Sequence, residues 1–270
     1  MTKPTSSTQA FDADVLFNKG GWPDFIQSQE KLFSKESLTR VSDGLREEFH
    51  CGHAEGRQMP SFQRSDWSSD VLEPFTGYPI GYDLPCLISR DRPTRGRIMF
   101  CAQDPLRKEG TPGVVTIGTF FGIDSERYRH YINPGRQVKA HHPAMWDVIR
   151  ACLDASYDVW LTDAVKVFAG PGNLLLKDKR GRQLCSEILA DEIAQVQPVR
   201  VVALGGKAAN ELHKVAVKQG GIDGDRIMAL PHPAYYKTKW YLEGAPRDYP
   251  SGVEGLRAAK RDFYCRALGL

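Results

Sequence analysis

The stretch that decides the fold is Arg97-Ile98-Met99-Phe100-Cys101-Ala102-Gln103-Asp104-Pro105-Leu106, an apolar run that ends in a polar Gln-Asp-Pro turn. A short apolar run bounded by turn residues is typical of a buried strand. A carboxylate just past the carboxyl end of such a strand occupies the position where open α/β sheets bind their ligands. Asp104 is therefore the first candidate for a functional residue.

Beyond residue 85 the sequence alternates strand-like and helix-like segments. Four short apolar runs predict strands at residues 97–101, 159–162, 199–204 and 226–230. Four segments with helical periodicity predict helices at residues 143–155, 183–195, 207–219 and 252–267. This alternation indicates parallel βαβ units with right-handed crossovers. We expect an α/β domain over residues 84–270, with a four-stranded parallel sheet in a three-layer α/β/α arrangement.

The first 83 residues have a different character. Residues 1–10 are rich in Ser and Thr and predict a mobile tail. Pro23 can open a helix, and a second helix is predicted after Ser34 because apolar residues recur there at helical spacing. Residues 50–85 are rich in Gly, Ser, Pro and isolated aromatics, which predicts irregular chain. We expect residues 1–83 to be a helical and irregular amino-terminal extension that packs on the core.

Length and composition set the outer bounds. The 270 residues suffice for one substantial core with an added subdomain or for two small domains, and a hydrophobic content of 41% argues against disorder of the whole chain. A net charge of +3 permits a polyanionic partner without requiring one. The six cysteines form no C-x-x-C pair and follow no secretory signal, which indicates reduced thiols in a cytoplasmic protein. No apolar run reaches the roughly 18 residues of a membrane helix.

A polar or glycine-bearing turn follows each of the four predicted strands. The turns lie at residues 103–105, 163–166, 205–207 and 231–233. Because the carboxyl ends of parallel strands meet at one edge of a sheet, we expect these turns to gather there. An acid, a histidine and several backbone donors would then share one cleft.

Two further motifs have weaker interpretations. The amides of the Gly205-Gly206-Lys207 turn could hold a phosphate, but the sequence is neither G-x-G-x-x-G nor a P-loop, so a plain strand-to-helix turn is favoured. The run His53-Ala54-Glu55 has the H-x-E pattern of zinc deaminases. That chemistry also requires P-C-x-x-C, and the stretch that begins at Pro85 lacks the second cysteine. We predict no metal site.

Taken in order, the four turns resemble the uracil-DNA glycosylase superfamily. The motifs are Ala102-Gln103-Asp104-Pro105, Leu161-Thr162-Asp163-Ala164-Val165-Lys166, Val201-Val202-Ala203-Leu204-Gly205 and Pro231-His232-Pro233-Ala234. The resemblance covers residues from about 84 to 270, and four motifs in matching order are more specific than any one of them. It implies a four-stranded parallel sheet between helices, and an enzyme that flips a damaged base out of DNA and hydrolyses its glycosidic bond.

Such a reaction requires two kinds of catalytic group. Positive charge develops on the sugar and negative charge on the departing base. A carboxylate can stabilise the sugar and orient water, and a hydrogen-bond donor can stabilise the base. The resemblance assigns the water-orienting role to Asp104 and the donor role to His232.

The residues expected to contact the base are Gln103, Leu106, Phe120, Phe121 and Asp163. Leu106 and Asp163 depart from the founding branch of the family. Leu106 replaces a tyrosine that blocks the thymine methyl group, and Phe120 or Phe121 is the candidate for stacking on the flipped base. Asp163 replaces the asparagine that reads uracil. Because an ionised carboxylate only accepts hydrogen bonds, a protonated Asp163, or a base with an exocyclic amine such as cytosine, would fit better. Alternatively, Asp163 binds backbone amides of the turn and another residue reads the base.

A second set is expected to contact DNA: Lys166, Gly205, Lys207, Tyr235, Tyr236, Lys237 and Lys239. Tyr235 or Tyr236 could be a wedge inserted into the duplex, and Lys237 and Lys239 could bind phosphates. The sequence also resembles the iron-sulfur branch around Cys185. Val167 stands where that branch has another cysteine and the amino-terminal C-x-x-C is missing, so we predict no cluster and no other cofactor.

The sequence therefore favours a monomeric DNA glycosylase of base excision repair, acting on uracil or a related deaminated base in DNA. Two alternatives remain: a catalytically silent nucleic-acid-binding protein of the same fold, and a hydrolase of free nucleosides.

Overall fold

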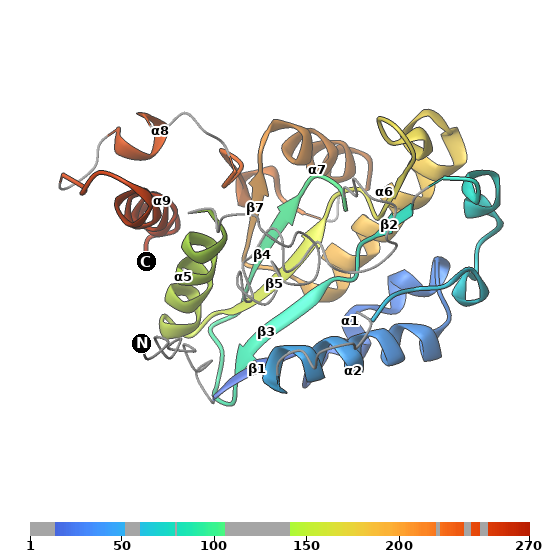
Figure 1. Cartoon of the computed structure of the whole chain (residues 1–270), viewed down its shortest axis with the longest axis horizontal. Coiled ribbons are helices and arrows are strands. Elements are labelled where there is room, and N and C mark those ends of the chain that lie inside the picture. Colours follow the sequence, from blue (N-terminus) through green and yellow to red (C-terminus); the bar gives the residue numbers. More distant parts are fainter. Residues whose placement is uncertain are drawn as a thin grey trace, which may run out of the picture.

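The computed structural model describes residues 14–51, 60–78, 80–105, 141–219, 222–234, 239–243 and 248–270. Its centre is a six-stranded sheet with the strand order β1-β3-β5-β4-β7-β8 (Figure 1). The strands are β1 (Val15–Phe17), β3 (Cys86–Arg90), β5 (Asp158–Asp163), β4 (Arg97–Ala102), β7 (Arg200–Leu204) and β8 (Ile227–Leu230). The mobile tail expected at residues 1–10 lies outside the described residues.

Four neighbouring strands of this sheet, β5, β4, β7 and β8, are parallel. They are the four strands that the apolar runs predict, so the α/β fold class is confirmed. The predicted number of strands was wrong, because β3 is antiparallel to β5 and β1 is antiparallel to β3. Antiparallel neighbours need no crossover helix, so the alternation of strands and helices did not reveal them.

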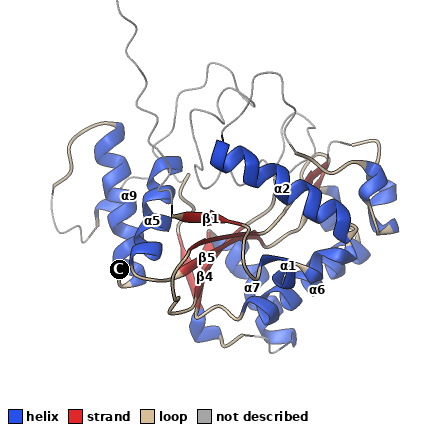
Figure 2. Ribbon diagram, turned by 90° about the horizontal axis from the view of Figure 1, so that it is seen from below, coloured by secondary structure: helices blue, strands red, loops and turns tan. Residues whose placement is uncertain are grey.

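The helices form two layers around the sheet, as Figure 2 shows. The four predicted helices are α5 (His141–Asp154), α6 (Lys179–Val196), α7 (Gly206–Gln219) and α9 (Val253–Leu268). From β4 the chain moves through α5 to β5 on one side, and from β5 through α6 to β7 on the other side of β4. Since right-handed crossovers in opposite directions put their helices on opposite faces, α5 and α6 cover different faces. Helix α9 packs on α5, and α7 packs beside α6.

The amino-terminal part is built into this sheet. It supplies β1, the short helix α1 (Trp22–Phe25) with Pro23 in its first turn, and the predicted longer helix α2 (Lys35–Cys51). The indole of Trp22 donates to the Pro85 carbonyl at 2.9 Å. The segment expected to be irregular also contains β2 (Ile80–Tyr82), which pairs with β6 (Val167–Ala169). A boundary at residue 83 stays a prediction.

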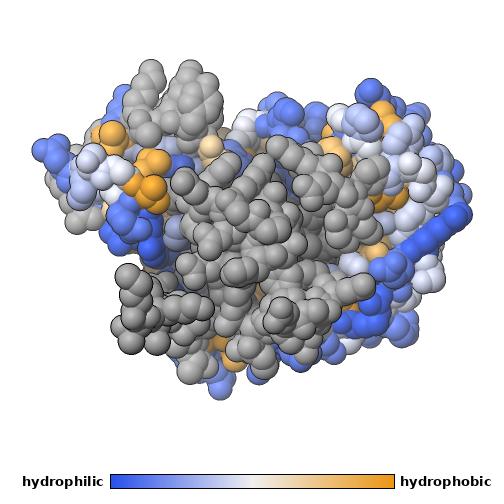
Figure 3. Space-filling view, viewed as in Figure 1, coloured by the Kyte–Doolittle hydropathy of each residue, from blue (hydrophilic) through white to orange (hydrophobic). Residues whose placement is uncertain are grey.

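The remaining elements are short. Within the described ranges, five 3-10 helices span Gln27–Lys31, Arg64–Asp66, Asp70–Phe75, Leu174–Lys177 and Gly224–Arg226, and helix α8 spans Lys239–Leu242. The described surface on the face in Figure 3 is mostly hydrophilic, with hydrophobic residues in scattered spots. Over the described ranges, every helix is too short or too polar to cross a bilayer.

Candidate active site

The carboxyl ends of the parallel strands bring the predicted turns together. At the end of β4, Ala102 lies in register with Asp163 of β5, and Cys101 with Ala203 of β7. One strand farther on, Leu204 of β7 lies in register with Leu230 of β8. The turns after β4, β5, β7 and β8 therefore follow one another along one edge of the sheet, as the strand pattern predicts.

Asp104 lies in the turn after β4, and its side chain is almost fully buried, with 5% of the residue exposed. Burial raises the pKa of Asp104, while a hydrogen bond from the Gln103 amide and the charge of Lys207 offset part of that rise. The backbone joins this turn to the next one: the Ala164 N–H donates to the Ala102 carbonyl at 2.8 Å. The carboxylate is therefore held in a fixed, largely dehydrated position.

A cavity of about 970 Å³ opens beside Asp104. One wall is the amino-terminal half of α7, with Lys207, and the other is the segment after β5, with Val165 and Phe168. Gln103 and Asp104 also line it. Its volume is at the upper end of the range for small-molecule sites, so it has room for more than one nucleobase. Gln103, Asp104 and Lys207 are thus the predicted site residues that meet at this cavity.

His232 follows β8, and its ring is oriented by the backbone. The Ala234 N–H donates to Nδ1 at 3.1 Å, so the proton of a neutral ring resides on Nε2. Burial, and secondarily the charge of Lys260, lowers the pKa of His232 to about 4. At neutral pH this imidazole is therefore uncharged and can act as a hydrogen-bond donor through Nε2.

Gly205 joins the end of β7 to the region of His232. Its φ of +97° lies in the left-handed range, and a Cβ added there would lie 3.5 Å from the Cβ of His232. Its N–H donates to the Leu230 carbonyl at 2.8 Å, which ties this turn to β8. Glycine is required here because L residues are strained at this φ.

Replacing Gly205 by alanine is expected to lower the free energy of unfolding by about 1–2 kcal/mol, because an L residue is strained in left-handed backbone. Chemical denaturation measures the change. Gly206→Ala is the matched control, since its added Cβ meets no atom within 4 Å and its φ lies outside the left-handed range. Equal stabilities of the two variants would contradict the argument.

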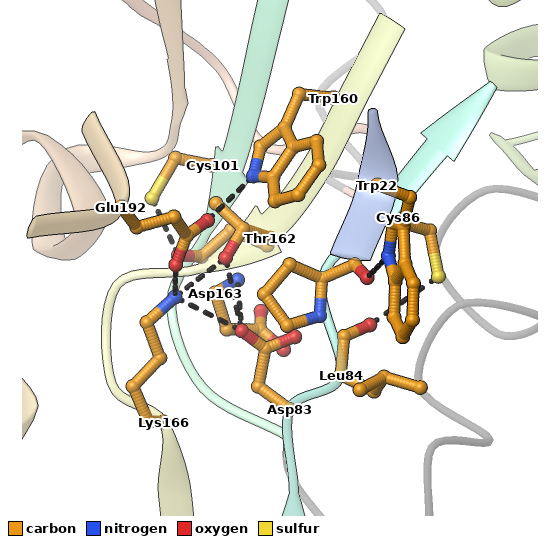
Figure 4. Close-up of polar contacts among 12 residues, drawn as sticks. Trp22, Asp83, Leu84, Cys86, Cys101, Trp160, Thr162, Asp163, Lys166 and Glu192 are labelled. Carbon is orange, nitrogen blue, oxygen red and sulfur yellow. Dashed lines mark hydrogen bonds and ion pairs between the residues drawn. The ribbon is translucent and has the colours of Figure 1, made fainter. Parts of the chain in front are cut away.

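Asp163 ends β5 and is 2% exposed. Its N–H donates to Oδ2 of Asp83 at 3.1 Å. The same Asp83 oxygen accepts hydrogen bonds from Thr162 at 2.9 Å and from the Lys166 ammonium at 3.0 Å (Figure 4). The backbone of the residue expected to read the base is therefore fixed by a buried carboxylate from the segment before β3.

Lys166 is part of this buried network and has 0% exposure. Its Nζ lies 2.5 Å from Oε2 of Glu192, whose other oxygen accepts a hydrogen bond from the Trp160 indole (Figure 4). Burial alone would lower the pKa of Lys166, but Glu192 and Asp83 raise it above its usual value. The predicted DNA contact of Lys166 was wrong, because its ammonium is enclosed by these groups and cannot reach a phosphate.

Asp83 and Glu192 are functional neighbours that the sequence pattern does not predict. Asp83 lies in a stretch without periodicity and offered no signal. Glu192 did offer one: it occupies the apolar face of α6, between Ile188, Leu189 and Val196, where a charge is expected to be buried and paired.

Of the other predicted residues, some lie at the starts of helices α7 and α8, and the rest lie outside the described residues. Gly205 and Lys207 lie at the start of α7, and Lys239 begins α8. Leu106, Phe120, Phe121, Tyr235, Tyr236 and Lys237 lie outside the described residues, so their proposed contacts with base and DNA stay predictions.

The family model of the Uracil DNA glycosylase superfamily matches residues 90–248, more than half of the chain. This segment contains β4, β5, β7 and β8 together with the four turns at their carboxyl ends. No curated protein matches the chain.

Proposed function

Since the chain belongs to the Uracil DNA glycosylase superfamily, we propose that it hydrolyses the N-glycosidic bond of uracil or a related deaminated base in DNA. The family supports a DNA glycosylase activity in general, and the substrate base is our proposal. The observation that carries it is the combination of a buried carboxylate after β4 with a neutral, oriented histidine after β8, on the same edge of the sheet.

Asp104 is proposed to act on the sugar side of the bond. As the bond between C1′ and the base nitrogen breaks, the electron pair leaves with the base and positive charge develops on the sugar. The carboxylate stabilises this charge and accepts a hydrogen bond from the water that attacks C1′. Its burial strengthens both interactions, because little water competes with them.

His232 is proposed to act on the base side. The departing base carries the electron pair and becomes anionic, so a donor to its oxygen lowers the barrier. The Ala234 N–H occupies Nδ1 of His232, so Nε2 carries the proton that can be donated. A neutral ring is suited to this role because it stabilises the anion through a hydrogen bond while keeping its own proton.

The proposed base contacts come from Gln103 and Asp163, with Leu106 and Phe120 or Phe121. Asp163 has its N–H bound to Asp83, so the position of its backbone is determined before substrate arrives. A carboxylate at this place favours a base that offers a donor, and uracil then requires a protonated Asp163. The alternative function is that of a nucleic-acid-binding protein without catalysis. It is supported by the same residue, because Asp163 replaces the asparagine that reads uracil.

Lys207 and the turn at Gly205-Gly206 are proposed to contact DNA beside the flipped base. They lie at the start of α7, where the first N–H groups of a helix have no partner within the helix and can bind a phosphate. Tyr235 or Tyr236 is proposed as the wedge, and Lys237 and Lys239 as phosphate contacts. The protein is proposed to act as a monomer.

The test is a panel of oligonucleotides that carry uracil, hypoxanthine, xanthine or cytosine at one position, in single and double strands. Abasic sites, revealed by alkaline strand cleavage, are expected from at least one of these bases. The His232→Gln variant, purified in the same way, is the control for contaminating glycosylases and should form far fewer abasic sites. Binding of DNA without release of any base would contradict the proposal, and turnover of free nucleosides alone would favour a nucleoside hydrolase.

A further inference from the structure

Three side chains from the carboxyl-terminal helices bind the turn that carries His232. The Tyr264 hydroxyl donates to the carbonyl of Pro231, and the Tyr241 hydroxyl donates to that of His232 at 3.0 Å. The Lys260 ammonium donates to the carbonyl of Pro233 at 2.6 Å. Three successive carbonyls are thus each held by one side chain from α8 or α9.

These donors form a rigid platform. Tyr241 and Tyr264 are fully buried, and Lys260 is 4% exposed. Helix α9, which carries two of them, is fastened to α5 by two contacts between Arg257 and Asp147, of 2.7 and 2.8 Å. A backbone held at three consecutive carbonyls by such a platform has little freedom, so the ring of His232 is presented in one position.

Lys260 adds a charge to this platform, and within the described part of the chain no carboxylate forms an ion pair with it. Its Nζ lies 5.0 Å from the centroid of the Tyr241 ring. Burial alone lowers the pKa of Lys260 to about 8, with no carboxylate of the described residues opposing that shift. A buried cation without an anionic partner costs stability, and an apolar side chain would avoid that cost. This cation contacts the turn that carries His232, and its charge contributes to the lowered pKa of that histidine.

The charged and titratable groups around His232 come from several elements. Lys260 and Tyr264 face the turn from α9, and Tyr241 faces it from α8. From β7, backbone of Gly205 lies against it. The remaining charges of this part of α9 are engaged elsewhere: Arg257 with Asp147, and Arg261 with Asp262 at 2.7 Å.

We propose that Lys260 is a positioning residue for His232: with Tyr241 and Tyr264 it fixes the turn, and its positive charge disfavours a proton on Nδ1, so that Nδ1 keeps accepting the Ala234 N–H and the ring keeps its orientation. The catalytic part of this inference rests on the proposed function, whereas the electrostatic part concerns the free protein. If Nδ1 carried a proton, it could no longer accept the hydrogen bond from the Ala234 N–H, and the ring would turn away from its present orientation. Repulsion from Lys260 disfavours that proton.

The test is a pH titration of the histidine rings by nuclear magnetic resonance, which requires no substrate. The chain has seven histidines, and the His232→Gln variant identifies the signal of interest. In the wild-type protein His232 is expected to titrate near pH 4. In Lys260→Met its pKa should rise by about one unit, because burial, the larger cause, remains. In Lys260→Arg, which restores the charge, the low value should return.

Two matched variants separate the charge from the hydrogen bonds. Arg261→Met removes a cation from the same helix that is engaged with Asp262, and Tyr241→Phe removes a donor to the turn without removing a charge. Both should leave the pKa of His232 near the wild-type value. A wild-type His232 that titrates near 6.5, or an unchanged titration in a folded Lys260→Met protein, would overturn the inference.

Base release from DNA supplies the second readout. Relative to wild type, Lys260→Met should lose more activity at pH 5.5 than at pH 7.5, because a larger fraction of His232 is then protonated. An equal loss at both pH values would overturn the catalytic part. If the wild-type protein releases no base from any DNA, the proposed function fails, while the ring titration still decides the electrostatic part.

Discussion

Replacing Asp104 by asparagine is expected to lower the rate of base release by about 100- to 10,000-fold, because one positioned catalytic carboxyl group is lost. The amide has almost the same shape but carries no negative charge to stabilise the sugar, and it binds water less strongly as an acceptor. The measurement is a single-turnover rate on the base that the oligonucleotide panel identifies. Excess protein keeps binding from limiting that rate.

The same substitution is expected to leave the free energy of unfolding unchanged or slightly higher. Burial raises the pKa of Asp104, so the ionised carboxylate is destabilised in the folded protein. A loss of activity without a loss of stability separates a catalytic group from a structural one. Asp70→Asn is the matched control, because that aspartate is paired with Arg180 at the surface and 73% exposed. A rate for Asp104→Asn within a few-fold of the control would remove Asp104 from the mechanism.

Replacing Lys166 by methionine is expected to lower the free energy of unfolding by about 3–5 kcal/mol, since it leaves buried carboxylates without their counter-charge. The ammonium contacts Asp83 at 3.0 Å and Glu192 at 2.5 Å, and all three groups are almost fully buried. Methionine fills a similar volume, so the effect of charge dominates over that of a cavity. Urea denaturation at pH 7.5 measures the loss.

The pH dependence of that loss identifies its cause. Burial already raises the pKa of Glu192, and Lys166 opposes that rise, so without the ammonium the pKa of Glu192 in the folded variant should rise further. Folding then favours the protonated Glu192, the stability of the variant increases as the pH falls through that raised pKa, and the difference from wild type becomes smaller at pH 5 than at pH 7.5. Lys214→Met is the control: its ion pair with Glu211 has a 58% exposed lysine and should contribute less than about 1 kcal/mol. Equal losses in the two variants would contradict the argument.

The sequence predicts strands and site residues best where the local hydrophobic pattern matches the burial in the folded protein. The runs that form β4, β5 and β7 are buried almost throughout, so they are continuous apolar segments between helices, whereas β8 at the edge of the sheet is only partly buried. Because these strands are parallel, their pattern predicts that Asp104 and His232 lie at one edge of the sheet. The order of the four motifs then singled out these two residues from the other acids and histidines of the chain.

The errors at the site share one physical cause, which is contact between residues far apart in the sequence. A lysine in a polar turn is normally exposed, which made Lys166 look like a phosphate contact. Its partners Asp83 and Glu192 lie 83 and 26 residues away in the sequence, and no local periodicity reports such a meeting. The contacts of Tyr241, Lys260 and Tyr264 with the turn of His232 could not be predicted from the sequence for the same reason. Strands β1 and β3 were missed because the first has three residues and the second lies in a stretch without helical neighbours.

The bond from the Asp163 N–H to Asp83 limits how the protein can be shortened. The segment that the family model matches begins at residue 90, yet a carboxylate seven positions earlier fixes the backbone of the residue expected to read the base. A fragment that starts at residue 90 would keep Asp104, Lys166 and His232 but would lack one of the two carboxylates that contact the ammonium. We therefore expect the smallest stable fragment of this chain to begin upstream of Asp83, before the segment that the family model matches.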